Sequence, residues 1–371
     1  MIHDVIIVGA GVSGCTAARI LADKGKKVLI LEKRSHTGGN CYDYKNELGI
    51  TIQKYGPHIF HTNSEEVWEF LNRFTGFNNY EHRVLSNRNG RFFPVPINKK
   101  TVCDFFNLDI NTTDVKKVLR QEVENSFFND PPENFEDQVI SQVGERLYKA
   151  FFQNYTKKQW RKDPKNLSAD IAKRVPVRDN LDDKYFSDKY QGIPSNGFSD
   201  MFIKMLDYPN IDILLNTDYF DVKIPYEPEL IVYTGELDMF FDYKYGELEY
   251  RSLKFRYENL EKENFQPAAV VNYPGNESWT RITEYKQFLN EKNDSTTLCY
   301  EYPADSGEPY YVVINNDNLK KRELYMQEVK KLEDQGNFLF TGRLAEYKYY
   351  NIDQAIEGAM VKVKERYANP V

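Results

Sequence analysis

The chain has 371 residues, enough for roughly two or three lobes with a substantial buried core. Its formal net charge of −7 is spread along the chain without long runs of one sign, which disfavours nucleic acid or an anionic membrane as the main partner. The four cysteines stand apart from one another, and no apolar run approaches the roughly 18 residues of a membrane span, so we expect a cytoplasmic protein.

Residues 4–40 have the pattern of a strand, a glycine turn, a helix and a second strand. Gly9, Gly11 and Gly14 form G-x-G-x-x-G between the strand "DVIIVG" and the helix. In this motif the glycines allow a tight turn, a close approach to a pyrophosphate and close packing of helix on strand. Glu32 ends the second strand, where a carboxylate can accept hydrogen bonds from a ribose. Together these features predict dinucleotide binding.

The stretch after the second strand bears on which dinucleotide is bound. Lys33 and Arg34 could suit a phosphorylated ribose, but the Glu32 carboxylate would repel that phosphate. The following "RSHTGGNCYD" contains Gly39 and Asn40, an extension that is more typical of flavoproteins than of nicotinamide dehydrogenases. The sequence therefore favours FAD, and a merely flexible loop at this point is the alternative.

Two histidines, His58 and His61, stand three residues apart in "KYGPHIFHTN". No cysteine or acidic cluster accompanies them, so no metal site is predicted. We expect instead a loop pressed against the ring system of the flavin.

The rest of the chain divides into stretches with different patterns. Residues from about 100 to 178 have helical spacing, 246–330 are rich in Tyr, Val and Thr with turn signals, and 336–371 return to strand and then helix. The prediction is an α/β fold: a Rossmann-like FAD-binding domain with an inserted helical lobe and an antiparallel β-sheet lobe. The predicted ranges are 1–75, 195–245 and 331–371 for the FAD-binding domain, 99–178 for the helical lobe, and 76–98, 179–194 and 246–330 for the sheet lobe.

Eight blocks of the sequence resemble a known family, the bacterial UDP-galactopyranose mutases. In chain order they are "GGN", "KYGPHIFHTN", "YTKKQW", "YFSDKYQGIP", "EYRSLKF", "TRITEYKQF", "EPYY" and "GRLAEYKYY". The resemblance implies a homodimer that interconverts UDP-galactopyranose and UDP-galactofuranose with reduced FAD. The flavin attacks the anomeric carbon and displaces UDP, and an iminium lets the sugar ring open and reclose.

The resemblance also implies a role for individual residues. Arg174 and Arg281 would hold the diphosphate, whose negative charge grows as UDP leaves, and lysine would lose the planar fork of arginine. The implied catalytic residues are Arg174, Arg281, Tyr349 and His61. The implied FAD contacts are Gly9, Gly11, Ser13, Gly14, Glu32, Lys33, Gly39, Asn40, His58, Ile59, Arg343, Tyr350 and Asn351. The implied substrate contacts are His82, Phe151, Phe152, Tyr155, Thr156, Trp160, Arg174, Tyr185, Asn272, Arg281, Tyr311 and Tyr349.

Periodicity alone would assign the aromatic residues of "AFFQNYTKKQW" to the core, because 152, 155 and 156 share one face of a helix. The resemblance instead places them at the uridine and makes Trp160 the gate of the cleft, next to a polar loop, 161–166, that we expect to move. Tyr347, unlike Tyr349, is expected to pack.

The chain departs from the family pattern in four places: Arg161 follows "QW", His82 stands near a frequent Asn, Val312-Val313 replaces a Pro-containing stretch, and Asn351 replaces a frequent Asp. Because His82 and Arg161 could change the space around the second carbon of the sugar, UDP-N-acetylgalactosamine is an alternative substrate. An FAD oxidoreductase related to amine oxidases, or a non-catalytic sensor, is a rival reading.

Overall fold

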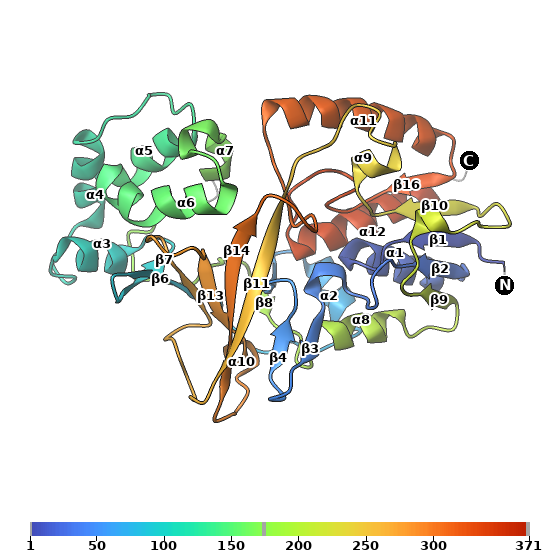
Figure 1. Cartoon of the computed structure of the whole chain (residues 1–371), viewed down its shortest axis with the longest axis horizontal. Coiled ribbons are helices and arrows are strands. Elements are labelled where there is room, and N and C mark those ends of the chain that lie inside the picture. Colours follow the sequence, from blue (N-terminus) through green and yellow to red (C-terminus); the bar gives the residue numbers. More distant parts are fainter. Residues whose placement is uncertain (1, 173–175, 369–371) are drawn as a thin grey trace.

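The computed structural model describes residues 2–172 and 176–368. Figure 1 shows three parts in a row: a parallel sheet with helices, a larger sheet in the middle, and a lobe of helices at the far end. The N-terminus lies beside the parallel sheet, at the end of the molecule away from the helical lobe. Among the described residues, no helix is long and apolar enough to cross a membrane.

The parallel sheet has the strand order β16-β10-β1-β2-β9, with the first strand of the chain in the centre. Its strands are β1 (Val5–Val8), β2 (Val28–Leu31), β9 (Ile211–Leu214), β10 (Leu230–Tyr233) and β16 (Phe338–Phe340). The chain therefore leaves β1 for β2 on one side and reaches β10 on the other. A sheet of this kind binds ligands where the strand order reverses, at the carboxyl ends of its strands.

Both faces of this sheet are covered by apolar clusters. Successive side chains of a strand point to opposite faces, so each strand contributes to both clusters. Val5 and Ile7 of β1 belong to one apolar cluster and Ile6 and Val8 to another. The first cluster also takes residues from α1 (Val12–Asp23), α2 (Glu65–Asn72), α8 (Phe198–Leu206) and α12 (Ile352–Ala368). The second takes residues from α9 (Leu237–Phe240) and α11 (Asn316–Asp334).

The central sheet has the order β15-β11-β14-β13-β12-β6-β7. Its neighbours pair antiparallel except β12 and β6, which run parallel. The strands are β6 (Val84–Arg88), β7 (Arg91–Val95), β11 (Tyr250–Leu260), β12 (Val270–Asn272), β13 (Arg281–Glu284), β14 (Thr296–Ala304) and β15 (Tyr311–Val312). Smaller elements are the pairs β3 (Asp43–Lys45) with β4 (Thr51–Gln53) and β5 (Phe60–Thr62) with β8 (Tyr190–Gly192), and the helix α10 (Lys286–Leu289).

The helical lobe has a core of its own, formed by residues such as Val102, Val139 and Leu147. Its elements are α3 (Lys99–Phe106), α4 (Val115–Glu124), α5 (Phe135–Leu147), a π-helical turn (Tyr148–Phe152), α6 (Gln153–Trp160) and α7 (Ala169–Ala172). The predicted fold class, a Rossmann-like domain with a second sheet and a helical insertion, is confirmed.

Candidate active site

One cavity of about 1040 Å³ is lined by residues of all three parts of the molecule. It extends from the glycine turn after β1, past the start of β13, to Phe135 and Ile171 of the helical lobe. Pockets for small ligands usually measure about 300–1,000 Å³. At about 1040 Å³ this cavity lies at the upper end of that range, as a site for a large ligand requires.

The glycine turn forms a cradle at the sheet end of the cavity. A Cβ added to Gly14 would lie 1.9 Å from the carbonyl oxygen of Gly9, so only glycine lets α1 pack this closely on β1. A Cβ at Gly11 would meet no atom within 4 Å, because this residue faces open space in the cavity. No side chain among the described residues caps the N-terminus of α1 at Gly11. Uncapped N–H groups at a helix N-terminus suit a pyrophosphate.

Glu32 stands at the carboxyl end of β2 and lines the same cavity. Its carboxylate accepts hydrogen bonds from the main-chain N–H of Ala10 at 2.6 Å and of Arg34 at 2.8 Å. These bonds fix the carboxylate beside the glycine cradle, where it can also accept from a ribose. On the other side of β1, Thr234 after β10 and Arg343 after β16 complete the rim. The cradle, the carboxylate and the cavity size fit FAD.

The two predicted histidines of "KYGPHIFHTN" have different surroundings. His58 Nδ1 lies 2.9 Å from the carbonyl oxygen of Gly56, and burial lowers the pKa of His58 to about 4. His61 Nδ1 lies 3.0 Å from the Asp188 carboxylate, and its ring stacks on Phe186 with 3.7 Å between centroids. Asp188 and Phe186 reach His61 because β5 pairs with β8 just beyond them. Both histidines line the cavity.

His82 also stacks on Phe186, with 5.7 Å between the ring centroids. It is 5% exposed, and its Nδ1 lies 3.0 Å from the Tyr80 hydroxyl. Burial lowers the pKa of His82 to about 3, and the charges of Arg281 and His61 act in the same direction. The imidazole is therefore neutral at physiological pH and meets the cavity as an uncharged hydrogen-bonding group.

The depressed pKa predicts a pH dependence of stability. Between about pH 6.5, the ordinary value, and pH 3, His82 takes up a proton in the unfolded chain but not in the folded one. The free energy of unfolding should therefore fall by ~1.4 kcal/mol per pH unit on acidification through this window. We expect His82→Asn to lose this contribution, so that its stability relative to the unmutated protein improves by ~2 kcal/mol between pH 7 and pH 5. Urea unfolding of both flavin-loaded proteins at pH 7 and pH 5 measures this change. A difference in the free energy of unfolding that stays the same at both pH values would contradict the prediction.

Arg281 is the first residue of β13, and its guanidinium contributes a positive charge to the lining of the cavity. Its Nη2 donates to the Tyr155 hydroxyl at 3.1 Å, and its Nε lies 3.3 Å from Glu301 Oε1. Glu301 is opposite Arg281 in the register of β13 and β14 and is 2% exposed. Burial lowers the pKa of Arg281, but Glu301 and then Tyr155 raise it well above its ordinary value. The guanidinium therefore stays charged, and Tyr155 and Glu301 fix its direction.

The aromatic wall of the cavity comes from the π-helical turn and α6. The single helix expected here is in fact a π-helical turn that ends at Phe152, followed by α6. Phe152, Tyr155 and Trp160 line the cavity, as does Thr156. Phe151 lines it too but also packs edge-to-face on Phe93 and Phe105. Such π-helical turns often occur at functional sites.

A lysine on α6 ties this helix to the segment between β12 and β13. Lys158 Nζ donates to three main-chain carbonyl oxygens, those of Tyr273, Glu277 and Trp279. The same segment joins Asn272, which lines the cavity, to Arg281. The aromatic wall and the cation are therefore held in one position relative to each other.

The C-terminal stretch "GRLAEYKYY" and the residue after it contribute to the lining of the cavity. Arg343, Tyr349, Tyr350 and Asn351 line it, and Tyr349 stacks on Tyr311 with 6.3 Å between centroids. Tyr347 is 1% exposed and lies in an apolar cluster, as the packing prediction required. The Tyr350 hydroxyl donates to Glu346 Oε1 at 3.2 Å.

The structure brings the predicted site residues together with two qualifications. Gly14 packs under the cradle instead of lining the cavity, and Arg174 lies outside the described residues. The other predicted residues all line the cavity, and their individual roles stay predictions. They are Gly9, Gly11, Ser13, Glu32, Lys33, Gly39, Asn40, His58, Ile59, His61, His82, Phe151, Phe152, Tyr155, Thr156, Trp160, Tyr185, Asn272, Arg281, Tyr311, Arg343, Tyr349, Tyr350 and Asn351.

The three residues that orient His61 and Arg281 had not been predicted: Asp188, Phe186 and Glu301. Asp188 and Phe186 belong to the block "YFSDKYQGIP", from which only Tyr185 had been selected. Glu301 stands in the apolar strand "TTLCYEYPA", where a single carboxylate among buried residues was an available signal. In the described part of the chain, no three His, Cys, Asp or Glu side chains form a group that could hold a metal ion.

Comparisons with known proteins agree with this geometry. A family model described as UDP-galactopyranose mutase matches residues 150–349, and one described as an NAD(P)-binding Rossmann-like domain matches 7–74. The chain is 37% identical to a dTDP-fucopyranose mutase of Escherichia coli, over 98% of this chain and 99% of that protein. It is 35% identical to the UDP-galactopyranose mutase of Mycoplasma genitalium, over 98% and 94%.

Among solved structures, a reduced UDP-galactopyranose mutase matches with a TM-score of 0.77 and 15% identity, over 99% of this chain and 94% of that one. A putrescine oxidase shares the fold more distantly, with a TM-score of 0.58 and 14% identity over 99% of both chains. At these identities the structures show the fold alone. Since the family model covers more than half of the chain and two relatives above 30% identity cover nearly all of it, the chain belongs to the UDP-galactopyranose mutase family of flavin-dependent nucleotide-sugar mutases.

Proposed function

We propose that this protein uses reduced FAD to interconvert UDP-galactopyranose and UDP-galactofuranose. The observation that supports this most is the single cavity in which the glycine cradle opens toward Arg281 and the aromatic wall. An enzyme whose cofactor reacts directly with the sugar of a nucleotide sugar needs both ligands in one space. The proposal includes FAD as the cofactor and a cytoplasmic homodimer as the working form.

Arg281 supplies the charge that a departing nucleoside diphosphate requires. At about 4 Å and an effective dielectric of about 20, an arginine stabilises one phosphate charge by about 4 kcal/mol. Because this stabilisation grows as the bond to the sugar breaks, it lowers the barrier rather than only tightening binding. Tyr155 keeps the guanidinium in place, and the stacked Tyr311 and Tyr349 bring two more hydroxyl groups to the same cavity. Reduced FAD, when bound, supplies the electron pair that attacks the anomeric carbon.

The aromatic wall holds the base and excludes water. Phe152 and Trp160 offer flat apolar surfaces on which a pyrimidine can stack without any charge. A sugar that has lost its diphosphate would be trapped by water, so a closed apolar wall protects it. Neutral His82 and the His61–Asp188 pair also line the cavity, where they can hold sugar hydroxyl groups.

Two other nucleotide sugars are alternative substrates. The similarity to the dTDP-fucopyranose mutase covers as much of the chain as the similarity to UDP-galactopyranose mutases and favours a dTDP-sugar as the second candidate. UDP-N-acetylgalactosamine is the third candidate, because His82 could change the space around the second carbon of the sugar. For an oxidoreductase of the amine oxidase type, the sequence similarity to flavin-containing amine oxidases covers only 15–24% of this chain, and such an enzyme would have no use for the Arg281 cation in the cavity.

The test is turnover by the reduced, flavin-loaded protein. The purified protein is reduced with dithionite and given UDP-galactofuranose, dTDP-fucofuranose or the furanose form of UDP-N-acetylgalactosamine, and the products are separated by chromatography. We expect conversion of UDP-galactofuranose to the pyranose form with the highest kcat/KM of the three. A higher kcat/KM for another sugar would correct the substrate, conversion of none would contradict the mutase function, and equal activity of oxidised protein would contradict the role of reduced flavin.

A further inference from the structure

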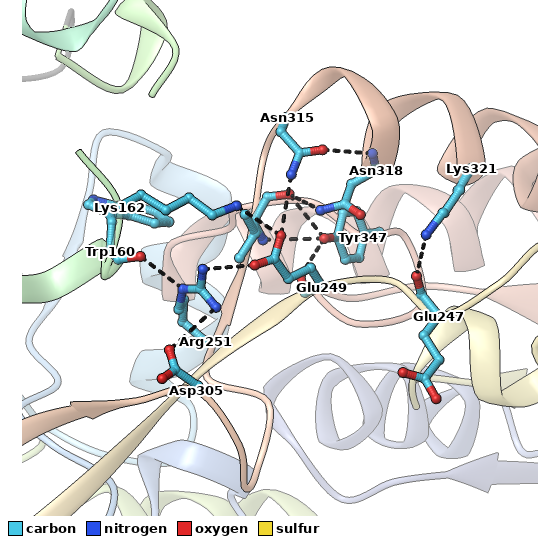
Figure 2. A network of polar contacts seen from close by, with 11 residues as sticks. Trp160, Lys162, Glu247, Glu249, Arg251, Asp305, Asn315, Asn318, Lys321 and Tyr347 are labelled. Atoms are coloured by element: carbon cyan, nitrogen blue, oxygen red, sulfur yellow. Dashed lines mark hydrogen bonds and ion pairs between the residues drawn. The ribbon is translucent and has the colours of Figure 1, made fainter. Parts of the chain in front are cut away.

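A polar junction joins all three parts of the molecule just outside the cavity, at the start of β11. Figure 2 shows Glu249 and Arg251 at its centre, with the end of α6 on one side and the turn that contains Tyr347 on the other. Glu249 Oε1 accepts from Arg251 Nη2 at 2.7 Å, and Glu249 Oε2 accepts from Lys162 Nζ at 3.0 Å. Neither carboxylate oxygen lines the cavity, so the proposed chemistry leaves this junction without a role.

Arg251 holds the end of the helix that carries the gate. Its Nε donates at 3.0 Å to the main-chain carbonyl oxygen of Trp160, the last residue of α6. This bond satisfies a carbonyl that the helix itself leaves free. Arg251 is 7% exposed, and its guanidinium uses two neighbouring nitrogens for two different partners. A planar guanidinium holds these two donors at a fixed spacing and in fixed directions, which the single nitrogen of an ammonium does not.

Arg161, the residue after Trp160, has a backbone conformation that side-chain contacts must stabilise. Arg161 has a φ of 48°, the left-handed conformation that disfavours a side chain by roughly 1–2 kcal/mol. Its Nη1 lies 3.3 Å from Asp305 Oδ2, and the other oxygen of Asp305 lies 4.0 Å from Arg251 Nη1. Lys162, the next residue, is held by Glu249. The reversal of the chain behind Trp160 is therefore fixed by side chains of the central sheet.

Glu249 also contacts the turn that contains Tyr347, through its main-chain carbonyl. The Tyr347 hydroxyl donates to the main-chain carbonyl of Glu249, with the carbonyl oxygen of Val313 3.1 Å away. Tyr347 has a φ of 46° and lies two residues before Tyr349, which lines the cavity. Asn315, at the N-terminus of α11, donates to Glu249 Oε2 at 3.3 Å. Burial raises the pKa of Glu249, but Lys162 and Arg251 lower it below its ordinary value, so the carboxylate stays charged.

We propose that Glu249 and Arg251 are positioning residues that hold Trp160 over the cavity and couple its position to the turn carrying Tyr349. Neither residue lines the cavity in which the substrate is proposed to bind. Arg251 acts through the Trp160 carbonyl and the Glu249 carboxylate acts through Lys162, while the main-chain carbonyl of Glu249 makes the link to Tyr347. The inference rests on the proposed function only in treating Trp160 as the gate, and its main readout needs no turnover.

The main experiment measures the exposure of Trp160 in flavin-loaded protein without substrate. Acrylamide quenching of tryptophan fluorescence is recorded for each protein, and the signal of its Trp160→Phe counterpart is subtracted. We expect Glu249→Gln and Arg251→Lys to raise the quenching constant of Trp160 about twofold, because the helix end is released. Glu247→Gln is the matched control: it stands two residues earlier, and the contact drawn to it in Figure 2 uses its main-chain oxygen.

Steady-state kinetics and a double-mutant cycle separate positioning from general damage. For the sugar nucleotide that is turned over, Glu249→Gln should raise KM about fivefold with kcat within about twofold. Lys162→Met should have a similar effect, and the double variant should be no worse than either single one, because the two groups act on each other. Quenching and KM that do not change, equal effects in Glu247→Gln, or additive effects in the cycle would each overturn the proposal. If no sugar nucleotide is turned over, the proposed function fails, and the quenching alone still decides this inference.

Discussion

Arg281→Lys should lower kcat/KM for the nucleotide sugar by about 10²–10³-fold while FAD stays bound. The substitution keeps one positive charge but removes the fork that reaches both Tyr155 and Glu301. A lysine at this position would be drawn to the buried Glu301 carboxylate and away from the diphosphate. The loss should appear in kcat as well as in the affinity for UDP, because the charge on the leaving group grows in the transition state.

Arg256→Lys provides the matched control for this experiment. Arg256 lies on β11, its side chain is 50% exposed, and it pairs with Glu258 away from the cavity. We expect it to leave turnover unchanged. The flavin absorbance per protein shows that FAD is retained in both variants, and titration with UDP measures nucleotide affinity. Turnover within about threefold of the unmutated protein in Arg281→Lys would remove this residue from the mechanism.

The features that the sequence predicted well are local ones. The glycine turn, Glu32 and the strand on either side of α1 lie within thirty residues, and each follows from spacing and residue type. The C-terminal tyrosines could also be divided correctly, since Tyr347 is buried and Tyr349 lines the cavity. That division came from a family resemblance and not from spacing, because a run of tyrosines has no periodicity that separates packing from function.

The site contacts that the sequence did not predict depend on pairing between distant strands. Glu301 faces Arg281 only because β13 and β14 pair in one register, and a shift by one residue would turn the carboxylate to the other face. Asp188 reaches His61 through the pairing of β5 with β8. The parallel pair of β6 and β12 joins residues far apart in the chain, and no local signal announces it. Sequence patterns therefore predict which elements form this site. The pairing register of distant strands decides which of its charged side chains contact each other.

Two glycines of the cradle should respond to alanine in different ways. In Gly14→Ala the new Cβ would meet the Gly9 carbonyl oxygen at 1.9 Å, so α1 must move away from β1. We expect a loss of ~3 kcal/mol or more in stability of the apoprotein, because backbone atoms cannot yield as a flexible side chain does. In Gly11→Ala the Cβ meets nothing within 4 Å, and the φ of −75° suits any residue. The apoprotein of Gly11→Ala should therefore melt within a few degrees of the unmutated one.

Gly11→Ala should nevertheless weaken FAD binding by about 10²-fold or more, because its methyl group occupies the space where a pyrophosphate approaches the backbone. Titration calorimetry of both apoproteins with FAD, together with thermal unfolding, distinguishes the two effects. Gly358→Ala is the control: it lies within α12, its Cβ would also meet nothing within 4 Å, and it should keep full FAD affinity with slightly higher stability. Unchanged FAD affinity in Gly11→Ala would show that the dinucleotide does not pass over this cradle. A stable Gly14→Ala apoprotein would show that the contact between α1 and β1 can relax.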